Sequence, residues 1–438
     1  MDVVLHCGYY YPDTVGGTEA YVQMLGQDLQ ERGHEVAVAA PGEEERTYTH
    51  DGLSVYRYPV SQNPSQAEVQ GRARPESVDT WAEWLAEIDP DLVHMHSLTR
   101  GCSVHHAEAV TRRDIPLFIT VHVPEVSCPR GTMMRWGTTP CDGEIRPVRC
   151  GACTLQQRGM PRPLAWAMSA ASITGVGRGM PGSLSTALQR APLVQQRKDA
   201  LQAWMRSAAH VVVVAGWLKD VLVRNEIPAD HITVSRHGLS ESVRIPQEEA
   251  ARKRSPRTEG DPLRVGFVGR FTEVKGPHVM VEAVRRLPDD VDVEAHLYGM
   301  AQSEQDRAYL SDMKHSAADE PRVQFCGPLT DDNRVEAFAG FDMLGVPSVW
   351  FETGPYTVLE AFAADLPVLG SNHGGIAERV DDGESGVLVP PGDVRGWTTA
   401  LKQLYETFRN GRWEWTLPDL RTSRAISRDM DKMYRDLS

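Results

Sequence analysis

Short apolar runs alternate with segments of helical periodicity along most of the chain. In the first half, runs typical of buried β-strands occupy Val3–Cys7, Val36–Ala40, Leu92–Met95, Leu117–Val121 and Val211–Ala215. The first run leads into a stretch where Tyr21, Leu25 and Leu29 share one face of a helix. Such β/α alternation predicts a mostly parallel sheet with helices on both faces.

The alternation is interrupted between residues 241 and 261, where the chain is charged and contains two prolines. We interpret this stretch as a linker between domains. Strand-like runs then resume at Leu263–Val268, Val291–Tyr298, Val323–Phe325, Met343–Val346 and Pro367–Leu369. The expected fold is therefore α/β, with two doubly wound, Rossmann-like domains in residues 1–240 and 262–415 facing a central cleft. A helical segment at 416–438 is expected to pack back on the first domain.

Acidic residues outnumber basic ones, since Lys plus Arg number 46 and Asp plus Glu 60, which gives a formal net charge of −14. Nucleic-acid-binding proteins usually carry a basic domain or stripe, so this balance argues against nucleic acid as a partner. The first residues show no secretory signal, and the uncharged stretch Pro163–Gly177 is too short to cross a bilayer. We expect a cytoplasmic protein, for which contact with a membrane is not indicated.

The first candidate chemistry directly follows the strand-like run that opens the second half of the chain. Arg270 and Lys275 lie five residues apart in the sequence GRFTEVKG. On a loop between a strand and a helix, the two cations can converge on one anion. A diphosphate leaving group requires such neutralisation because negative charge develops on it as its bond breaks. A solvated basic loop is the alternative that the spacing alone leaves open.

Two carboxylates eight residues apart, Glu352 and Glu360, form the second candidate. Pro355 suits the first turn of a helix, so Glu352 is expected on the preceding loop and Glu360 inside the helix. The backbone amides expected at the positive end of this helix are those of Gly354, Tyr356 and Thr357. Together these groups fit a sugar, a diphosphate and a ribose in order. Two surface glutamates near a helix start are the alternative.

With these motifs in place, nearly the whole chain resembles the retaining nucleotide-sugar glycosyltransferases of family 4, which have the GT-B fold. The N-terminal part resembles the family through YPDTVGGTEAYVQMLGQDLQERGHEVAV. The segments DPDLVHMHS, TVH at Thr120–His122 and GRFTEVKG follow in the family's order. The most specific segment is PSVWFETGPYTVLEAFAADLPVLGSNHGGIAERVDDGESGVLVPPGD. The resemblance implies that residues 1–240 form the acceptor side and that residues 262–415 bind the nucleotide sugar.

The resemblance also implies a role for each matching position. Glu352 is expected to hold the donor sugar, Glu360 the ribose hydroxyls, and Arg270 and Lys275 the donor diphosphate, with Gly16 and Gly17 approaching the donor and His122 beside the acceptor. Reaction is expected with retention at the anomeric carbon, the leaving phosphate accepting the acceptor's proton. No metal or other cofactor is then required for catalysis, which depends on charge stabilisation and positioning.

Three places depart from the family's usual pattern. Gly354-Pro355 stands where many members have Phe-Gly, Arg236-His237-Gly238 stands where Asn-Gly is common, and Val123 replaces an aspartate. The expected reaction is transfer of a hexose-type sugar from a nucleoside diphosphate sugar, UDP favoured over GDP, to a hydroxyl of a glycan, glycolipid or small metabolite. A nucleotide-sugar hydrolase or epimerase and a non-catalytic, zinc-containing interaction module are the alternatives.

Four of the seven cysteines, Cys128, Cys141, Cys150 and Cys153, are spaced C-x12-C-x8-C-x2-C. In a cytoplasmic protein this spacing favours a metal site over a disulfide framework. Four thiolates suit tetrahedral zinc, and an iron–sulfur cluster is disfavoured because the expected chemistry transfers no electrons. Such a zinc ion would be structural and would cross-link an insertion at about residues 123–200. Four reduced cysteines in that insertion are the alternative.

Overall fold

The chain folds as two compact units in a computed structural model that describes residues 1–13, 16–69, 73–175, 186–258 and 260–437. Unit 1 consists of Met1–Arg236 and the C-terminal segment that begins at Ser423. Unit 2 consists of His237–Thr422. None of the helices in the described ranges combines the length and apolar character that crossing a membrane requires.

Unit 1 is built around an eight-stranded sheet with the spatial order β10-β9-β6-β5-β1-β2-β4-β3. The strands are β1 (Asp2–His6), β2 (Glu35–Gly42), β3 (Arg46–His50), β4 (Leu53–Pro59), β5 (Leu92–Met95), β6 (Leu117–Val121), β9 (His210–Val213) and β10 (Ile232–Val234). All neighbours pair in parallel except β3, which lies antiparallel to β4 at one edge. Each apolar run predicted for the first half overlaps one of these strands, although the runs Val3–Cys7 and Val211–Ala215 extend one and two residues past β1 and β9. The mostly parallel arrangement is therefore confirmed.

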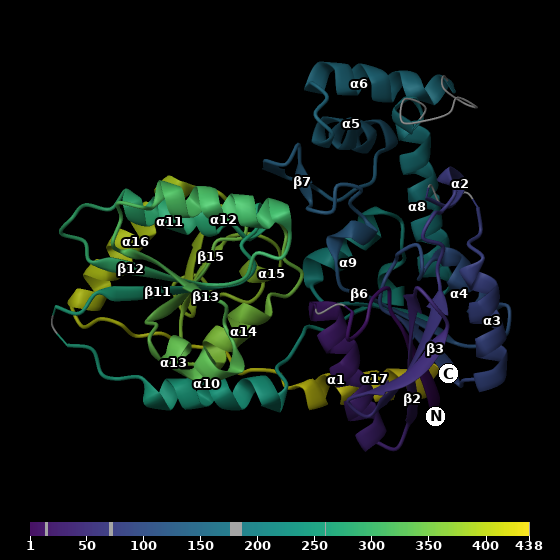
Figure 1. Ribbon diagram of the computed structural model, residues 1–438, viewed down its shortest axis with the longest axis horizontal. Coiled ribbons are helices and arrows are strands. Elements are labelled where there is room, and N and C mark those ends of the chain that lie inside the picture. The colour runs from purple at the N-terminus through teal and green to yellow at the C-terminus, as the bar shows by residue number, and fades with distance from the viewer. Residues whose placement is uncertain (14–15, 70–72, 176–185, 259, 438) are drawn as a thin grey trace. The chain divides into compact units, whose positions relative to one another are not determined.

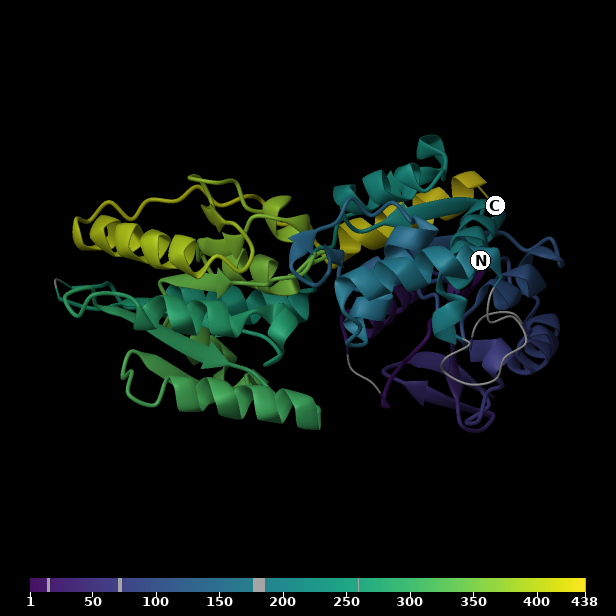
Figure 2. The ribbon, with the colours of Figure 1, turned by 90° about the horizontal axis from the view of Figure 1, so that it is seen from above.

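Helices cover both faces of this sheet. They are α1 (Gly17–Glu31), α2 (Gln66–Val69), α3 (Ser77–Ile88), α4 (Val104–Thr111), α5 (Pro147–Gln157), α6 (Arg162–Ala171), α8 (Arg190–Ser207), α9 (Gly216–Arg224) and α17 (Ser423–Leu437). Along β1, Val3 and Leu5 pack into one core with α1 and α17, whereas Val4 packs into the other with α3, α4 and α8. Helix α17, yellow in Figures 1 and 2, lies against α1, so the end of the chain completes the core of its beginning.

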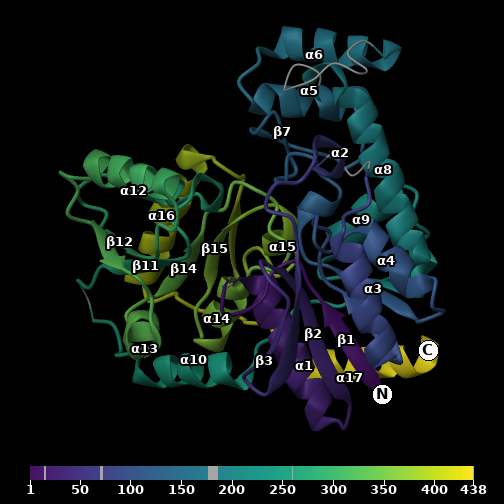
Figure 3. The same cartoon turned by 45° about the vertical axis from the view of Figure 1, so that its right-hand side comes forward.

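The residues after β6 form an insertion that stands beyond one end of the unit 1 sheet (Figure 3). It contains a short hairpin, β7 (Met134–Arg135) and β8 (Thr139–Pro140), and the helices α5 and α6, which pack on each other and on α8. Within the described residues, its own apolar cluster has Ala152, Leu155 and Ala165 fully buried, with Trp136, Met160, Met168 and Ala187 partly buried around them. Residues 176–185 of the predicted insertion lie outside the described residues.

Unit 2 contains a six-stranded, fully parallel sheet with the order β13-β12-β11-β14-β15-β16. Its strands are β11 (Leu263–Val268), β12 (Val293–Tyr298), β13 (Val323–Gly327), β14 (Met343–Val346), β15 (Val368–Ser371) and β16 (Gly386–Val389). Its helices are α10 (Glu241–Lys253), α11 (Pro277–Arg285), α12 (Glu304–Ser316), α13 (Asp331–Ala339), α14 (Tyr356–Ala363), α15 (Gly374–Ala377) and α16 (Val394–Arg409). This strand order is that of the Rossmann fold, as predicted.

The prediction that residues 241–261 form a linker is wrong for most of that stretch. Residues 241–253 form α10, which packs on α13 and α14 inside unit 2. Pro246 removes one backbone hydrogen bond from the helix, and the apolar contact of the fully buried Ala250 with the core of unit 2 offsets part of the loss. The charged residues that suggested a linker lie on the outer face of an amphipathic helix.

Candidate functional site

The candidate donor site lies where the strand order of unit 2 reverses. The chain proceeds outward from β11 to β13 and then returns to place β14 on the other side of β11. Lys275 lies in a short 3₁₀ turn (Glu273–Lys275) after β11, and Glu352 lies on the loop after β14. Both side chains therefore follow the carboxyl ends of adjacent parallel strands, where open α/β sheets bind ligands.

Glu352 is the centre of a buried polar cluster. Its side chain is almost fully buried, and its Oε1 atom lies 2.7 Å from Lys275 Nζ. The same oxygen accepts hydrogen bonds from Ser348 Oγ at 2.7 Å and from Trp350 Nε1 at 2.9 Å. Burial opposes ionisation, but the Lys275 charge and the three donors outweigh it and hold the pKa of Glu352 below its usual range. The carboxylate is therefore ionised and fixed in place.

Glu360 lies one turn inside α14, as predicted, and the helix begins one residue after Pro355. Its carboxylate is 3.6 Å from the guanidinium of Arg334 on α13. Burial raises the pKa of Glu360, and the nearby Arg334 charge partly opposes that rise. The residues predicted to supply phosphate-binding amides, Gly354, Tyr356 and Thr357, occupy the approach to α14 and its first turn.

Two residues that hold Glu352 were missed by sequence reasoning. Ser348 and Trp350 lie four and two residues before it, so only the turn after β14 brings their donors onto its carboxylate. No spacing rule for helices or strands predicts this arrangement. An indole N–H and a hydroxyl so close in sequence to a predicted site glutamate were the available signal.

His237 is a third residue that sequence reasoning did not place in the donor site. Its Nδ1 donates to the carbonyl oxygen of Gly354 over 3.2 Å, and its ring stacks on Tyr356 with centroids 4.8 Å apart. Burial lowers the pKa of His237 to about 4, so the ring is neutral at neutral pH. The sequence has Arg236-His237-Gly238 where the family commonly has Asn-Gly. This difference was the available sign that His237 supports the loop before α14.

The Lys275 loop depends on a glycine. Gly276 has φ of +69°, and an added Cβ would overlap the carbonyl oxygen of Pro347 on the loop after β14. The two loops that carry Lys275 and Glu352 therefore touch through backbone atoms. A side chain at this position would separate them.

We expect Gly276→Ala to lower the free energy of unfolding by about 2–3 kcal/mol, because it adds both left-handed strain and a backbone clash. Gly327→Ala is the matched control, since Gly327 has φ of +82° and open space around the Cβ position. Urea denaturation of both variants measures the difference. Equal losses would show that the close approach of the two loops contributes nothing to stability.

Arg270 is exposed on the loop that directly follows β11. The structure places it five residues before Lys275 on the same connection between β11 and α11. Its role beside Lys275 on one anion remains a prediction.

The predicted site residues of unit 1 gather around the start of α1 and the end of β6. Gly16 caps the N-terminus of α1 and Gly17 is its first residue. His122, directly after β6, is buried with its Nε2 3.1 Å from Nδ1 of His96, and its ring meets Tyr21 of α1 edge to face at 4.7 Å. His122 is therefore a packed, oriented ring rather than a surface histidine.

The four cysteines of the predicted metal site line one small cavity in the insertion. All four are free thiols, and Cys153 is buried. As placed, no three His, Cys, Asp or Glu side chains within the described ranges form a group that could hold a metal ion. Zinc therefore remains a prediction.

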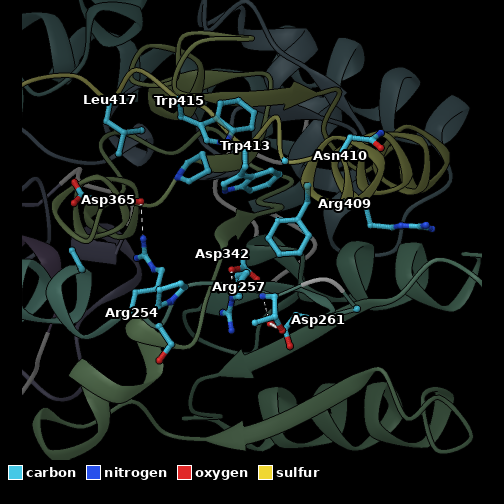
Figure 4. Close-up of a pocket in the computed structure, with 18 residues that line it drawn as sticks. Arg254, Arg257, Asp261, Asp342, Asp365, Arg409, Asn410, Trp413, Trp415 and Leu417 are labelled. Carbon is cyan, nitrogen blue, oxygen red and sulfur yellow. Dashed lines mark hydrogen bonds and ion pairs between the residues drawn. The ribbon is translucent and has the colours of Figure 1, made fainter.

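A cavity of about 1190 Å³ in unit 2 lies away from the Lys275–Glu352 pair. Asp261 and Asp342, which precede β11 and β14, place it at the amino ends of the strands. Figure 4 shows Trp413 and Trp415 across this cavity from Arg254 and Arg257. Arg257 is paired with Asp342 at 2.6 Å. The size of this cavity does not make it the active site, because ligands of open α/β sheets bind at the opposite, carboxyl ends.

Comparisons with solved structures agree with this fold. Alr3699/HepE of Anabaena in complex with UDP and glucose superposes with a TM-score of 0.61 and 14% identity over 100% of both chains. Sucrose-phosphate synthase of Thermosynechococcus elongatus gives a TM-score of 0.60 and 16% identity over 100% of this chain and 99% of that one. These likenesses confirm the predicted GT-B fold.

Curated relatives are similar over part of their length. A D-inositol 3-phosphate glycosyltransferase of Corynebacterium kroppenstedtii is 30% identical over 223 residues, which cover 49% of each chain. One of Stackebrandtia nassauensis is 31% identical over 182 residues, which cover 40% of this chain and 41% of the relative. The chain thus matches about half of these relatives' length or less.

Two family descriptions together account for most of the chain. Residues 248–408, which contain the Lys275–Glu352 pair and Glu360, match "Glycosyl transferases group 1". Residues 16–238, which contain Gly16, Gly17 and His122, match "Glycosyl transferase 4-like domain". The second match covers half of the chain, and the GT-B fold extends throughout. The chain therefore belongs to the family of glycosyltransferases that combine a 4-like domain with a group 1 domain.

Proposed function

We propose that this protein is a retaining hexosyltransferase that moves a sugar from a UDP-sugar to a hydroxyl acceptor. The observation that carries the proposal is the Lys275–Glu352 ion pair at the strand-order reversal of unit 2. A cation next to a buried, ionised carboxylate at this position suits a ligand with an anionic part joined to a hydroxyl-rich part. A sugar diphosphate is such a ligand.

Each donor-site residue then has a physical task. Lys275, with Arg270 on the same loop, neutralises the diphosphate as it departs, and the N-terminus of α14 adds partial positive charge. Glu352 accepts hydrogen bonds from sugar hydroxyls, and Glu360 accepts them from the ribose. His237 keeps the loop before α14 in place through its bond to Gly354. These charges stabilise the leaving group without a metal at the diphosphate.

Retention follows if the acceptor attacks from the face that the diphosphate leaves, with the leaving phosphate oxygen taking the acceptor's proton. The bond to the anomeric carbon breaks toward the diphosphate, and the bond to the acceptor oxygen forms on the same face. In unit 1, His122 is the residue we assign to the acceptor side. Its contact with His96 fixes the orientation of its ring.

Two likenesses support the choice of substrates. The Anabaena protein was solved with UDP, with UDP and glucose, and with UDP-glucose, which favours a uridine donor. The curated relatives are named for D-inositol 3-phosphate, a polyol phosphate, which favours a small hydroxylated acceptor. UDP-glucose with D-inositol 3-phosphate is therefore the first pair to test, ahead of GDP-sugars and of glycan or glycolipid acceptors.

We expect the protein to bind UDP-glucose by calorimetry and to yield a product whose anomeric proton has the donor's configuration by NMR. A product of opposite configuration would contradict retention. Release of free or epimerised sugar without acceptor, as fast as transfer with it, would favour a hydrolase or epimerase. Absence of binding across a panel of UDP- and GDP-sugars would instead favour a non-catalytic module.

A further inference from the structure

The insertion after β6 places four thiols from three chain segments around one small cavity. Cys128 follows the 3₁₀ turn Pro124–Val126, Cys141 follows β8, and Cys150 and Cys153 lie on α5. All four line a cavity of about 30 Å³. A cavity of this size has room for a single ion and none for an organic ligand.

The contacts of these thiols leave their sulfur atoms available. Cys141 Sγ is 3.7 Å from Asp142 Oδ1, and Cys150 Sγ is 3.9 Å from the carbonyl oxygen of Glu144. Both are weak interactions of a weak donor, so deprotonation of the thiols removes little hydrogen-bond energy. Cys153 Sγ instead accepts a hydrogen bond from the backbone N–H of Trp136 at 3.3 Å. Outer-shell donors of this kind orient metal-bound thiolates.

Two arginines lie beside the same cavity. Arg130 and Arg149 contribute to its wall. Arg130 is anchored by bonds from Nη1 to the Cys153 carbonyl oxygen at 3.3 Å and to Gln156 Oε1 at 3.0 Å. Four thiolates around a divalent cation leave a net charge of −2, and the Arg130 guanidinium next to the cavity offsets part of it. Arg149 is already paired with Asp142, at 2.7 Å from Nη1 to Oδ2, and adds no net charge.

The insertion also needs a constraint that its core does not provide. Among the described residues, its separate apolar cluster has three fully buried side chains, all small or medium, with four partly buried ones packed around them. The β7–β8 hairpin has two residues in each strand. Segments with so little buried apolar surface usually depend on a metal or a disulfide for a defined structure. A bond among the four thiols would connect the chain before β7, the chain after β8 and α5.

We propose that Cys128, Cys141, Cys150 and Cys153 bind one structural Zn²⁺ ion as a four-thiolate site, drawing the side chains into the cavity from their metal-free positions. Zinc suits a tetrahedral set of four sulfur ligands, and no open position remains for chemistry. Binding releases the thiol protons and couples the metal to the folding of the insertion. The proposal concerns unit 1 alone and does not depend on the proposed sugar transfer.

Elemental analysis of full-length protein, purified without metal-affinity chromatography or chelators, tests the site. We expect about one zinc per chain, and a loss of about tenfold or more in Cys150→Ser and Cys153→Ser. Cys326→Ser is the matched control, because Cys326 is a partly buried free thiol of unit 2 and should leave the zinc content unchanged.

A measurement on the unchanged protein guards against variants that fail to fold. Stepwise titration with a mercurial reagent should release zinc in proportion to the thiols it blocks, and cobalt exchanged into the site should show sulfur charge-transfer absorption with tetrahedral d–d bands. A Cys150–Cys153 disulfide, iron with acid-labile sulfide, or chains that remain metal-free when refolded with zinc would each overturn the proposal.

Discussion

Replacing Lys275 with alanine should lower the rate of sugar transfer by about 10²–10³-fold. Its ammonium lies 2.7 Å from Glu352 Oε1 and is the charge that we propose meets the departing diphosphate. This charge matters most as the glycosidic bond breaks, so kcat and kcat/KM should fall together. Steady-state kinetics over a range of UDP-sugar concentrations measures both losses. Calorimetry with UDP alone should show weaker binding as well.

The variant should remain folded, because Glu352 keeps its hydrogen bonds from Ser348 and Trp350. Without the cation the pKa of Glu352 rises, so the residual activity should fall further as the pH is lowered, since the protonated form gains population. Lys253→Ala is the matched control: it removes an exposed lysine paired with Glu249 on α10 and should leave the rate unchanged. A near-normal rate in Lys275→Ala would remove the basis of the donor assignment.

The strands that were predicted to the residue share one property. Leu92–Met95, Leu117–Val121, Leu263–Val268 and Met343–Val346 lie inside their sheets and are buried on both faces. Apart from polar residues such as His94 and Arg264, these strands are apolar runs, so little polar alternation blurs their ends. Strand β3 was missed because it is an antiparallel edge strand whose residues Arg46–His50 are largely exposed and polar. An edge strand leaves little apolar signal.

Helix α10 shows what local patterns leave undetermined. Its charged outer face and Pro246 suggested a linker. The helix is stabilised by packing against the apolar surface of α13 and α14. That surface is built from residues 331–363, far along the chain. Tertiary packing, rather than local propensity, decides the structure here.

The candidate site could be predicted in part because its main residues follow strands that are visible in the sequence. Lys275 and Glu352 each lie a few residues past an apolar run, and parallel strands place such positions at one edge of the sheet. Their direct pairing could not be predicted, since it depends on which two strands are neighbours. The contact of His237 with Gly354 joins residues 117 apart and depends on the whole of unit 2.

Glu352→Gln should separate recognition of the sugar from binding of the nucleotide. Glutamine keeps the size of the side chain but removes the charge that accepts the Lys275 and sugar hydrogen bonds, so transfer should fall by about 10²-fold or more. UDP should bind at least as tightly as it does to the unchanged protein, because Lys275 then keeps its full charge toward the diphosphate. Kinetics with UDP-sugar and calorimetry with UDP measure the two effects separately.

Glu282→Gln is the matched control, since it neutralises an acid on α11 that pairs with Arg285 and Arg286 away from the site. The double variant Lys275→Ala/Glu352→Gln adds a further check. Groups that act on one transition state through a shared contact give non-additive losses, so the double variant should lose less than the product of the single losses. If Glu352→Gln weakened UDP binding as much as Lys275→Ala, the carboxylate would serve the nucleotide, and its assignment to the donor sugar would be wrong.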